Sequence, residues 1–162
     1  MSEIVIRQAE DPVEVEAARR LFQAYQAATD IEACFQSFEA ELDGLPGVYA
    51  PPAGRLLIAW RGEEALGIVA LKTVEAGICE IKRLWVEPAA RGVGLGRALA
   101  EAVIQAAEGV DCGLLVLETA PQTMARAAAL YRTLGFDESA PYPGATEAEG
   151  IACMARALRQ AA

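Results

Sequence analysis

Between residues 80 and 100 the chain reads EIKRLWVEPAARGVGLGRALA. The apolar and aromatic residues that end at Val86 predict a strand, and Pro88 stops it because proline has no N–H to donate to a neighbouring strand. Three glycines follow within Gly92–Gly96, and the apolar residues after them recur at helical spacing. This segment therefore predicts a strand, a glycine-rich turn and a helix in direct succession.

The rest of the chain continues the alternation of strands and helices. Helical periodicity predicts helices at about 12–28, 35–42, 93–108 and 122–134, the first capped by Asp11. Runs typical of strands lie at about 55–60, 66–73, 78–86, 114–118 and 151–157. Residues 138–150, rich in Pro, Gly, Ala and acids, predict a long surface loop. The pattern favours an α/β class of the mixed α+β type, with helices on both faces of a mixed sheet and one domain over residues 1–162.

The glycine turn is suited to binding an anion. Glycine lets the backbone approach a ligand closely and turn its N–H groups toward one point. The free amides at a helix start and the positive end of the helix dipole together attract negative charge. Arg91 and Arg97 add positive charge on either side of the turn. The alternative interpretation is that these glycines merely make a tight connection between strand and helix.

Two other phosphate-binding turns are excluded by spacing. A P-loop needs Gly-Lys-Ser or Gly-Lys-Thr, which the chain lacks. A Rossmann turn G-x-G-x-x-G that began at Gly92 or Gly94 would place Arg97 or Leu99 where its third glycine belongs. The pattern that is present is R-x-x-G-x-G over Arg91–Gly96.

This pattern resembles the pyrophosphate loop of the GNAT acetyltransferase superfamily. The resemblance implies that the loop and the helix start bind the diphosphate of coenzyme A, and that the preceding strand end pairs its backbone with the pantetheine arm. It also implies acetyl-CoA as co-substrate and the GNAT acyl-CoA acyltransferase fold, with a mostly antiparallel sheet of six or seven strands. The implied coenzyme-binding residues are Leu84, Trp85, Val86, Arg91, Gly92, Val93, Gly94, Leu95, Gly96, Arg97, Ala98, Arg126 and Tyr131.

A second motif points to the same family. The run Met124–Phe136 is similar to the family's helix N-x-x-A-x-x-L-Y-x-x-x-G-F, except that Met124 stands where many relatives carry asparagine. The resemblance implies that Tyr131 is the general acid that protonates the departing thiolate; the alternative is a core tyrosine. Three further stretches are similar to a branch of uncharacterised bacterial acetyltransferases, namely Leu45–Pro52, Lys82–Leu84 and Pro141–Tyr142.

Composition narrows the chemistry. The chain has no histidine, which excludes Ser-His-Asp and Cys-His catalysis and histidine zinc sites, and we expect no metal. A net charge of −9 argues against a nucleic-acid partner. The sequence shows neither a membrane span nor a signal peptide, so we expect a cytoplasmic protein with no membrane partner. The four dispersed cysteines predict reduced, buried thiols: Cys34, Cys79, Cys112 and Cys153.

The expected reaction is acetyl transfer from acetyl-CoA to the amine of a small molecule. Such a transfer needs a base for the amine, and Glu80 lies eleven residues before Arg91, the spacing of the glutamate in the histone-acetyltransferase branch. An ion pair of Glu80 with Lys82 or Arg83 is the alternative, and Glu118 or a chain of waters is another route for the proton.

The family architecture implies that the acceptor enters between the first two helices and the late loop, opposite the coenzyme. The candidate acceptor-binding residues are Tyr25, Phe35, Phe38, Tyr49, Glu118 and Tyr142. Two other functions stay open: a silent acetyl-CoA-binding sensor or partner module, and acetylation of a protein N-terminus or lysine. The oligomeric state is also open, with a homodimer among the alternatives.

Overall fold

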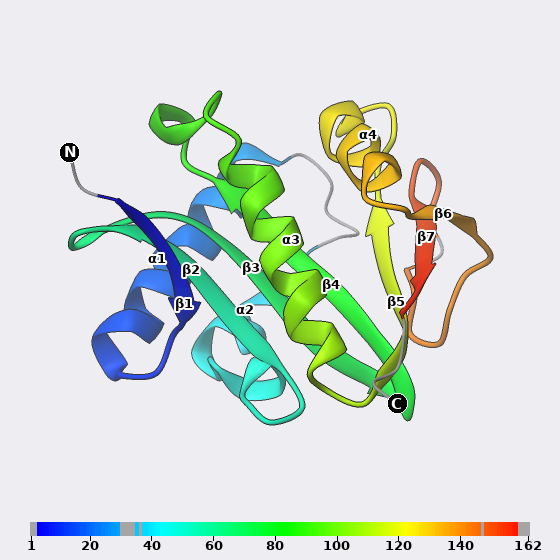
Figure 1. Ribbon diagram of the computed structural model, residues 1–162, viewed down its shortest axis with the longest axis horizontal. Coiled ribbons are helices and arrows are strands. Elements are labelled where there is room, and N and C mark those ends of the chain that lie inside the picture. The colour runs from blue at the N-terminus through cyan, green and yellow to red at the C-terminus, as the bar shows by residue number, and fades with distance from the viewer. Residues whose placement is uncertain (1–2, 30–34, 36, 147, 159–162) are drawn as a thin grey trace.

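The computed structural model describes residues 3–29, 35, 37–146 and 148–158 of the chain. Its centre is a seven-stranded sheet with helices on both faces (Figure 1). The strands are β1 (Ile4–Gln8), β2 (Arg55–Arg61), β3 (Glu64–Glu75), β4 (Gly77–Val86), β5 (Cys112–Thr119), β6 (Asp137–Ser139) and β7 (Ala152–Ala157). Their order across the sheet is β1-β2-β3-β4-β5-β7-β6. The expected mostly antiparallel sheet of six or seven strands is thus confirmed.

The one parallel pairing in this sheet, between β4 and β5, is short. It runs from Gly77 opposite Cys112 to Glu80 opposite Val116. Beyond Glu80 the two strands separate, as Figure 1 shows toward the top of the view. Among the described residues no strand pairs with this edge of β4 from Ile81 onward, so the sheet opens at its centre.

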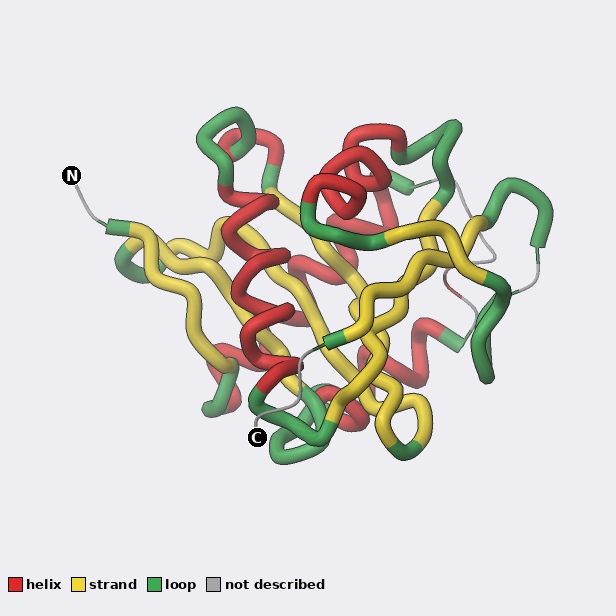
Figure 2. The backbone as a smooth tube through the Cα atoms, turned by 45° about the vertical axis from the view of Figure 1, so that its right-hand side comes forward, coloured by secondary structure: helices red, strands yellow, loops and turns green. Residues whose placement is uncertain are grey.

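The helices form two layers around the sheet (Figures 1 and 2). On one face α3 (Leu95–Glu108) and α4 (Ala125–Thr133) cover one apolar cluster, and on the other α1 (Pro12–Ala28) and α2 (Phe38–Asp43) cover a second. The start of α1 is defined by a capping box, in which Asp11 accepts a hydrogen bond from the Glu14 amide and Glu14 reaches back to the Asp11 amide. Two short 3₁₀ turns, η2 (Gly47–Tyr49) and η3 (Pro88–Ala90), lie in the connections.

A β-bulge interrupts β4 where it leaves β5. Lys82 lies opposite Ala70 and Trp85 opposite Ile68, so β4 carries one residue more than β3 between these points. Arg83 occupies the bulge with a φ of 62°, and its buried side chain turns toward α2. Its guanidinium carbon lies 4.9 Å from the ring centroids of both Phe35 and Phe38. The bulge therefore redirects the end of β4.

The structure differs from the sequence interpretation in two strands and in where three helices begin. Helix α2 begins at Phe38 rather than near 35, and α3 begins at Leu95 rather than near 93. Strands β1 and β6 were not expected, and β6 includes Glu138 and Ser139, which the sequence assigned to the late loop. Helix α4 begins at Ala125 rather than near 122, because the amides of Thr123 and Met124 donate to the Ala120 carbonyl in a turn. Both missed strands are five residues long or shorter.

Two composition-based expectations concern the cysteines and the membrane. Cys79 and Cys112 are buried, free thiols, Cys153 is also buried, and Cys34 lies outside the described residues. Within the described ranges, no helix has the length and apolar character needed to cross a bilayer.

Candidate active site

A cleft of about 580 Å³ opens where β4 and β5 separate. Its walls come from α1, β4, the glycine turn before α3, β5, α4 and the late loop. The lining residues that the sequence had singled out as candidate site residues are Tyr25, Glu80, Leu84, Trp85, Val86, Arg91, Gly92, Gly94, Leu95, Gly96, Glu118, Arg126 and Tyr131. The cleft therefore joins the glycine turn on one face of the sheet to a pair of carboxylates on the other.

One end of the cleft is an uncapped helix start. Gly94 is the N-cap of α3 and has no side chain to accept from the first amides of the helix. Gly92 and Gly94 have φ values of 89° and 82°, a region that other residues enter at a cost. The Ala98 amide already donates to the Gly94 carbonyl at 3.0 Å, so the three residues before it hold the free amides. This end fits an anion such as a diphosphate.

A cation and two aromatic rings form the wall beside that helix start. Arg91 donates a hydrogen bond to the Val86 carbonyl at 3.0 Å, and its guanidinium carbon lies 4.7 Å from the Trp85 ring centroid. The Trp85 ring in turn stacks on Tyr25 of α1, with centroids 5.7 Å apart. Arg91 thus holds the end of β4 while it brings positive charge to the cleft.

Two buried polar atoms on the cleft walls have no hydrogen-bond partner among the described residues. They are Nε1 of Trp85 and Oγ1 of Thr119. Unpaired polar atoms are costly to bury unless a ligand or water satisfies them. Together with the open edge of β4, they fit a cleft that takes up a polar, extended molecule such as a coenzyme A arm.

Tyr131 of α4 lines the cleft between the two ends. Its ring packs edge-on against Phe136 at a centroid distance of 5.4 Å. Burial raises the pKa of the Tyr131 hydroxyl, and the nearby Tyr25 raises it further. No described residue forms a hydrogen bond with this hydroxyl. The phenol therefore keeps its proton at neutral pH and is free to donate it into the cleft.

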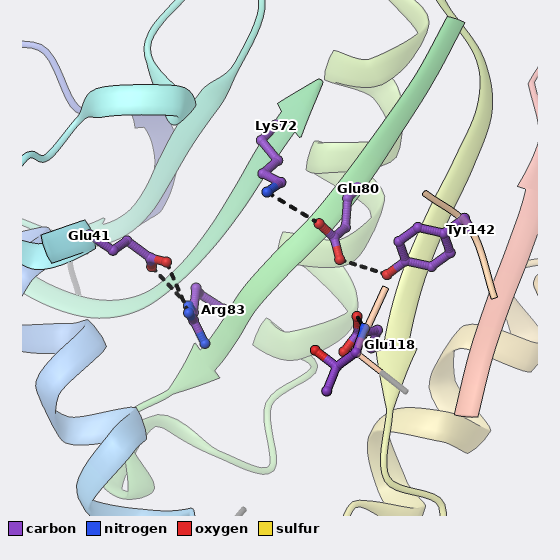
Figure 3. A network of polar contacts seen from close by, with 7 residues as sticks. Glu41, Lys72, Glu80, Arg83, Glu118 and Tyr142 are labelled. Carbon is purple, nitrogen blue, oxygen red and sulfur yellow. Dashed lines mark hydrogen bonds and ion pairs between the residues drawn. The ribbon is translucent and has the colours of Figure 1, made fainter. Parts of the chain in front are cut away.

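The other end of the cleft holds two carboxylates from adjacent strands (Figure 3). Glu80 of β4 is buried, accepts a hydrogen bond of 2.6 Å from the Tyr142 hydroxyl, and pairs with Lys72 at 3.8 Å. Glu118 of β5 accepts one of 2.6 Å from the Thr146 amide. The two acids thereby hold the late loop against the sheet, and Glu80 is paired with neither of the cations that the sequence suggested.

The other predicted coenzyme residues lie outside the cleft lining. Val93 is 71% exposed at the tip of the turn. Arg97 is exposed and engaged elsewhere, because it pairs with Glu101 at 2.7 Å and donates to the Thr133 hydroxyl at 3.1 Å. Ala98 is exposed in the first turn of α3, and its amide is already used within the helix.

Three of the predicted acceptor-binding aromatics also lie away from the cleft. Phe38 and Tyr49 are 3% and 1% exposed and belong to the core beneath α1 and α2, where Phe35 packs against them. Of the predicted aromatic wall, Tyr25 reaches the cleft directly, while Tyr142 lies behind it and touches Glu80. Large aromatic side chains bury the most apolar surface when they pack in the core, and this explains the difference.

The structure adds residues that the sequence interpretation did not assign to the site. Lys82, Thr119, Thr123 and Thr146 all line the cleft. The sequence did carry a signal for Lys82. It follows Glu80 by two residues, so the two charged side chains share one face of a strand expected to be central. The threonines carry no comparable signal, since nothing in the local sequence says that β4 and β5 separate beside them.

The comparisons with known proteins agree with this geometry. The sequence model of the acetyltransferase (GNAT) family matches residues 15–136. An uncharacterised N-acetyltransferase of Schizosaccharomyces pombe is 35% identical over 144 residues, which cover 87% of each chain.

Solved structures share the fold. The crystal structure of an acetyltransferase from Streptococcus agalactiae has a TM-score of 0.77 at 21% identity and covers 96% of this chain and 98% of its own. YncA of Salmonella typhimurium, solved with its cofactor acetyl-CoA, has a TM-score of 0.67 at 21% identity. The match covers 99% of this chain and 97% of YncA. With the family match over residues 15–136, we conclude that the chain belongs to the GNAT family of acetyl-CoA-dependent N-acetyltransferases.

Proposed function

We propose that this enzyme transfers the acetyl group of acetyl-CoA directly to the amine of a small-molecule acceptor, with both substrates bound in the same cleft. One observation carries the proposal: the cleft runs through the sheet from an anion-binding helix start to a pair of carboxylates. The diphosphate of the coenzyme would be bound at the start of α3 and beside Arg91 and Arg126. Acetyl-CoA supplies the activated thioester.

The protein groups divide the proton chemistry between them. Glu80 is the proposed base, because its Oε1 atom has a distant ion pair with Lys72 and no hydrogen bond among the described residues. Glu118, with one oxygen bound to the Thr146 amide, is the second candidate. Tyr131 is the proposed acid that gives a proton to the departing thiolate. An amine that reaches the carboxylates as an ammonium ion would lose its proton there before attack.

The open edge of β4 has a role in this scheme. Its backbone from Leu84 to Val86 lines the cleft and has no strand partner on the β5 side among the described residues. Unpaired strand amides can donate to the amide groups of the coenzyme arm and to the thioester oxygen as negative charge develops on it. Pairing of this kind would direct the reactive carbon toward the carboxylate end.

Thiol release from acetyl-CoA, measured with a panel of primary amines, tests the proposal. We expect release that depends on the amine and an acetylated product of matching stoichiometry. Glu80→Gln should lower kcat and change its pH dependence, while the dissociation constant of acetyl-CoA stays the same. Tight binding of acetyl-CoA without release for any amine would favour a sensor instead. Release that requires a peptide amine would favour a protein acetyltransferase.

A further inference from the structure

Lys82 lies on the cleft wall, and among the described residues its ammonium group has no ion-pair partner. It follows Glu80 by two residues in β4, so both side chains leave the strand on the same face. Lys82 is half-buried and lines the cleft. Among the described residues, none forms an ion pair or a hydrogen bond with its ammonium group. A cation in this position needs an anion or water to offset its desolvation.

The neighbouring charges are already engaged with one another. Arg83 pairs with Glu41 at 2.9 Å, and Lys72 pairs with Glu80 at 3.8 Å. Arg83 also lines the cleft but is held by Glu41, and the other lining arginines, Arg91 and Arg126, belong to the other end, beside the glycine turn and α4. Within the described part of the chain, Lys82 is thus the cation at the carboxylate end of the cleft that remains available to bind a ligand.

Burial disfavours the charged form of this side chain. Desolvation lowers the pKa of the Lys82 ammonium group, and the positive charges of Arg83 and Lys72 act in the same direction. Glu80 and Glu41 oppose the change without reversing it. An anion placed beside a partly desolvated ammonium group gains a stronger interaction than one on an open surface.

We propose that the acceptor is a small amine that also carries an anionic group, as an amino acid does, and that Lys82 binds this anion. This inference rests on the proposed function, because the amine of the same molecule would face Glu80 and Glu118. The arrangement also disfavours acceptors with several positive charges, since Lys82 would repel the second one. The net charge of −9 alone would favour any cationic amine. Lys82 restricts this preference to amines that also carry an anionic group.

Matched acceptor pairs provide the test. Each amino acid in a panel is compared with its own carboxamide, which keeps the amine and removes the anion. Rates are referred to the concentration of neutral amine, because the two amines have different pKa values. We expect kcat/KM to favour the carboxylate by about tenfold or more in the wild type, in line with a charge-assisted hydrogen bond. In Lys82→Met this ratio should fall close to one through a higher KM for the acceptor, and Lys82→Arg should restore part of it.

The chain offers a matched control, since its other lysine is Lys72. Lys72→Met removes a cation that already pairs with Glu80, and it should keep the carboxylate preference whatever it does to kcat. Binding of acetyl-CoA and the melting temperature show that each variant is folded. A ratio near one in the wild type, or an unchanged ratio in Lys82→Met, would overturn the assignment of Lys82. Absence of turnover with every amine would instead overturn the proposed function on which it rests.

Discussion

Arg83 and Glu41 form two parallel hydrogen bonds of 2.9 Å each, which connect the bulge of β4 to helix α2. The Arg83 side chain is 3% exposed and that of Glu41 18%, so the pair is largely withdrawn from water. A pair in this setting is more costly to break than to replace, because removing one partner leaves the other charge buried. The pair therefore secures the bulge that turns the end of β4 toward the cleft.

Loss of Glu41 should destabilise the fold and weaken the coenzyme site together. We expect Glu41→Ala to lower the free energy of unfolding by about 3 kcal/mol in urea titrations, because Arg83 would stay buried without a counter-ion. Glu39→Ala, at an exposed position in the same helix, should change it by less than about 0.5 kcal/mol. The double variant Glu41→Leu/Arg83→Met should recover part of the loss. Equal effects of Glu41→Ala and Glu39→Ala on the free energy of unfolding would contradict the role of the pair.

Gly94 should be needed for coenzyme binding through its backbone conformation. At a φ of 82°, Gly94→Ala costs about 1 kcal/mol of stability and shifts the free amides at the start of α3. We expect the dissociation constant of CoA to rise about tenfold, as measured by calorimetry. Gly62→Ala is the control, because Gly62 has a φ of 61° in the turn between β2 and β3 and is not among the cleft-lining residues. It should carry a similar stability cost and bind CoA normally.

Tyr131→Phe should separate catalysis from binding. The variant loses a proton donor, so we expect kcat to fall about 100-fold while the KM for acetyl-CoA stays within about twofold. Stability should change little, because the hydroxyl has no hydrogen bond to a described residue. The pKa of Tyr131 is raised above its ordinary value of 10.0, so the wild-type phenol keeps its proton at pH 10. The kcat of the wild type should therefore not fall through loss of this proton as the pH approaches 10. A fall in kcat of less than about threefold would remove Tyr131 from the mechanism.

The bond between Tyr142 and Glu80 can be measured by a double-mutant cycle. The Tyr142 hydroxyl donates a hydrogen bond to Glu80 at 2.6 Å. Burial raises the pKa of this phenol, and the Glu80 carboxylate raises it further. We expect a coupling energy of about 1.5–3 kcal/mol between Tyr142→Phe and Glu80→Gln, typical of a hydrogen bond to a charged group. Unfolding in urea gives the energies. Additivity of the two variants would mean that the contact does not hold the loop.

The sequence predicted the elements that carry strong periodicity. Helix α1 was expected at 12–28 and begins and ends there, because Asp11 and Pro12 mark its start and Val15, Leu21 and Phe22 give its apolar face. The short strands β1 and β6 were missed, since each depends on a partner distant in sequence: β1 pairs with β2, and β6 with β7. Pairing of this kind leaves little pattern in a segment of three to five residues.

The candidate site shows the same division. The glycine turn and the helix of Tyr131 could be read from local motifs, and both line the cleft. The partners of Glu80 could not, because Lys72 and Tyr142 come from a neighbouring strand and a loop 62 residues away. For Phe38 and Tyr49, an aromatic side chain has the same local sequence signal in a core as on a pocket wall. Their burial is decided by how α1 and α2 pack on the sheet.

The late loop is attached to β4 and β5 through the Tyr142 hydroxyl and the Thr146 amide. Both acceptors, Glu80 and Glu118, belong to the sheet, and the glycine turn and Arg91 lie at the other end of the cleft. Surface loops tolerate insertions and replacements better than strands do. Under the proposed function, a replacement in this loop would change the surroundings of Glu80 and Glu118 at the acceptor end and leave the glycine turn and Arg91 at the coenzyme end untouched.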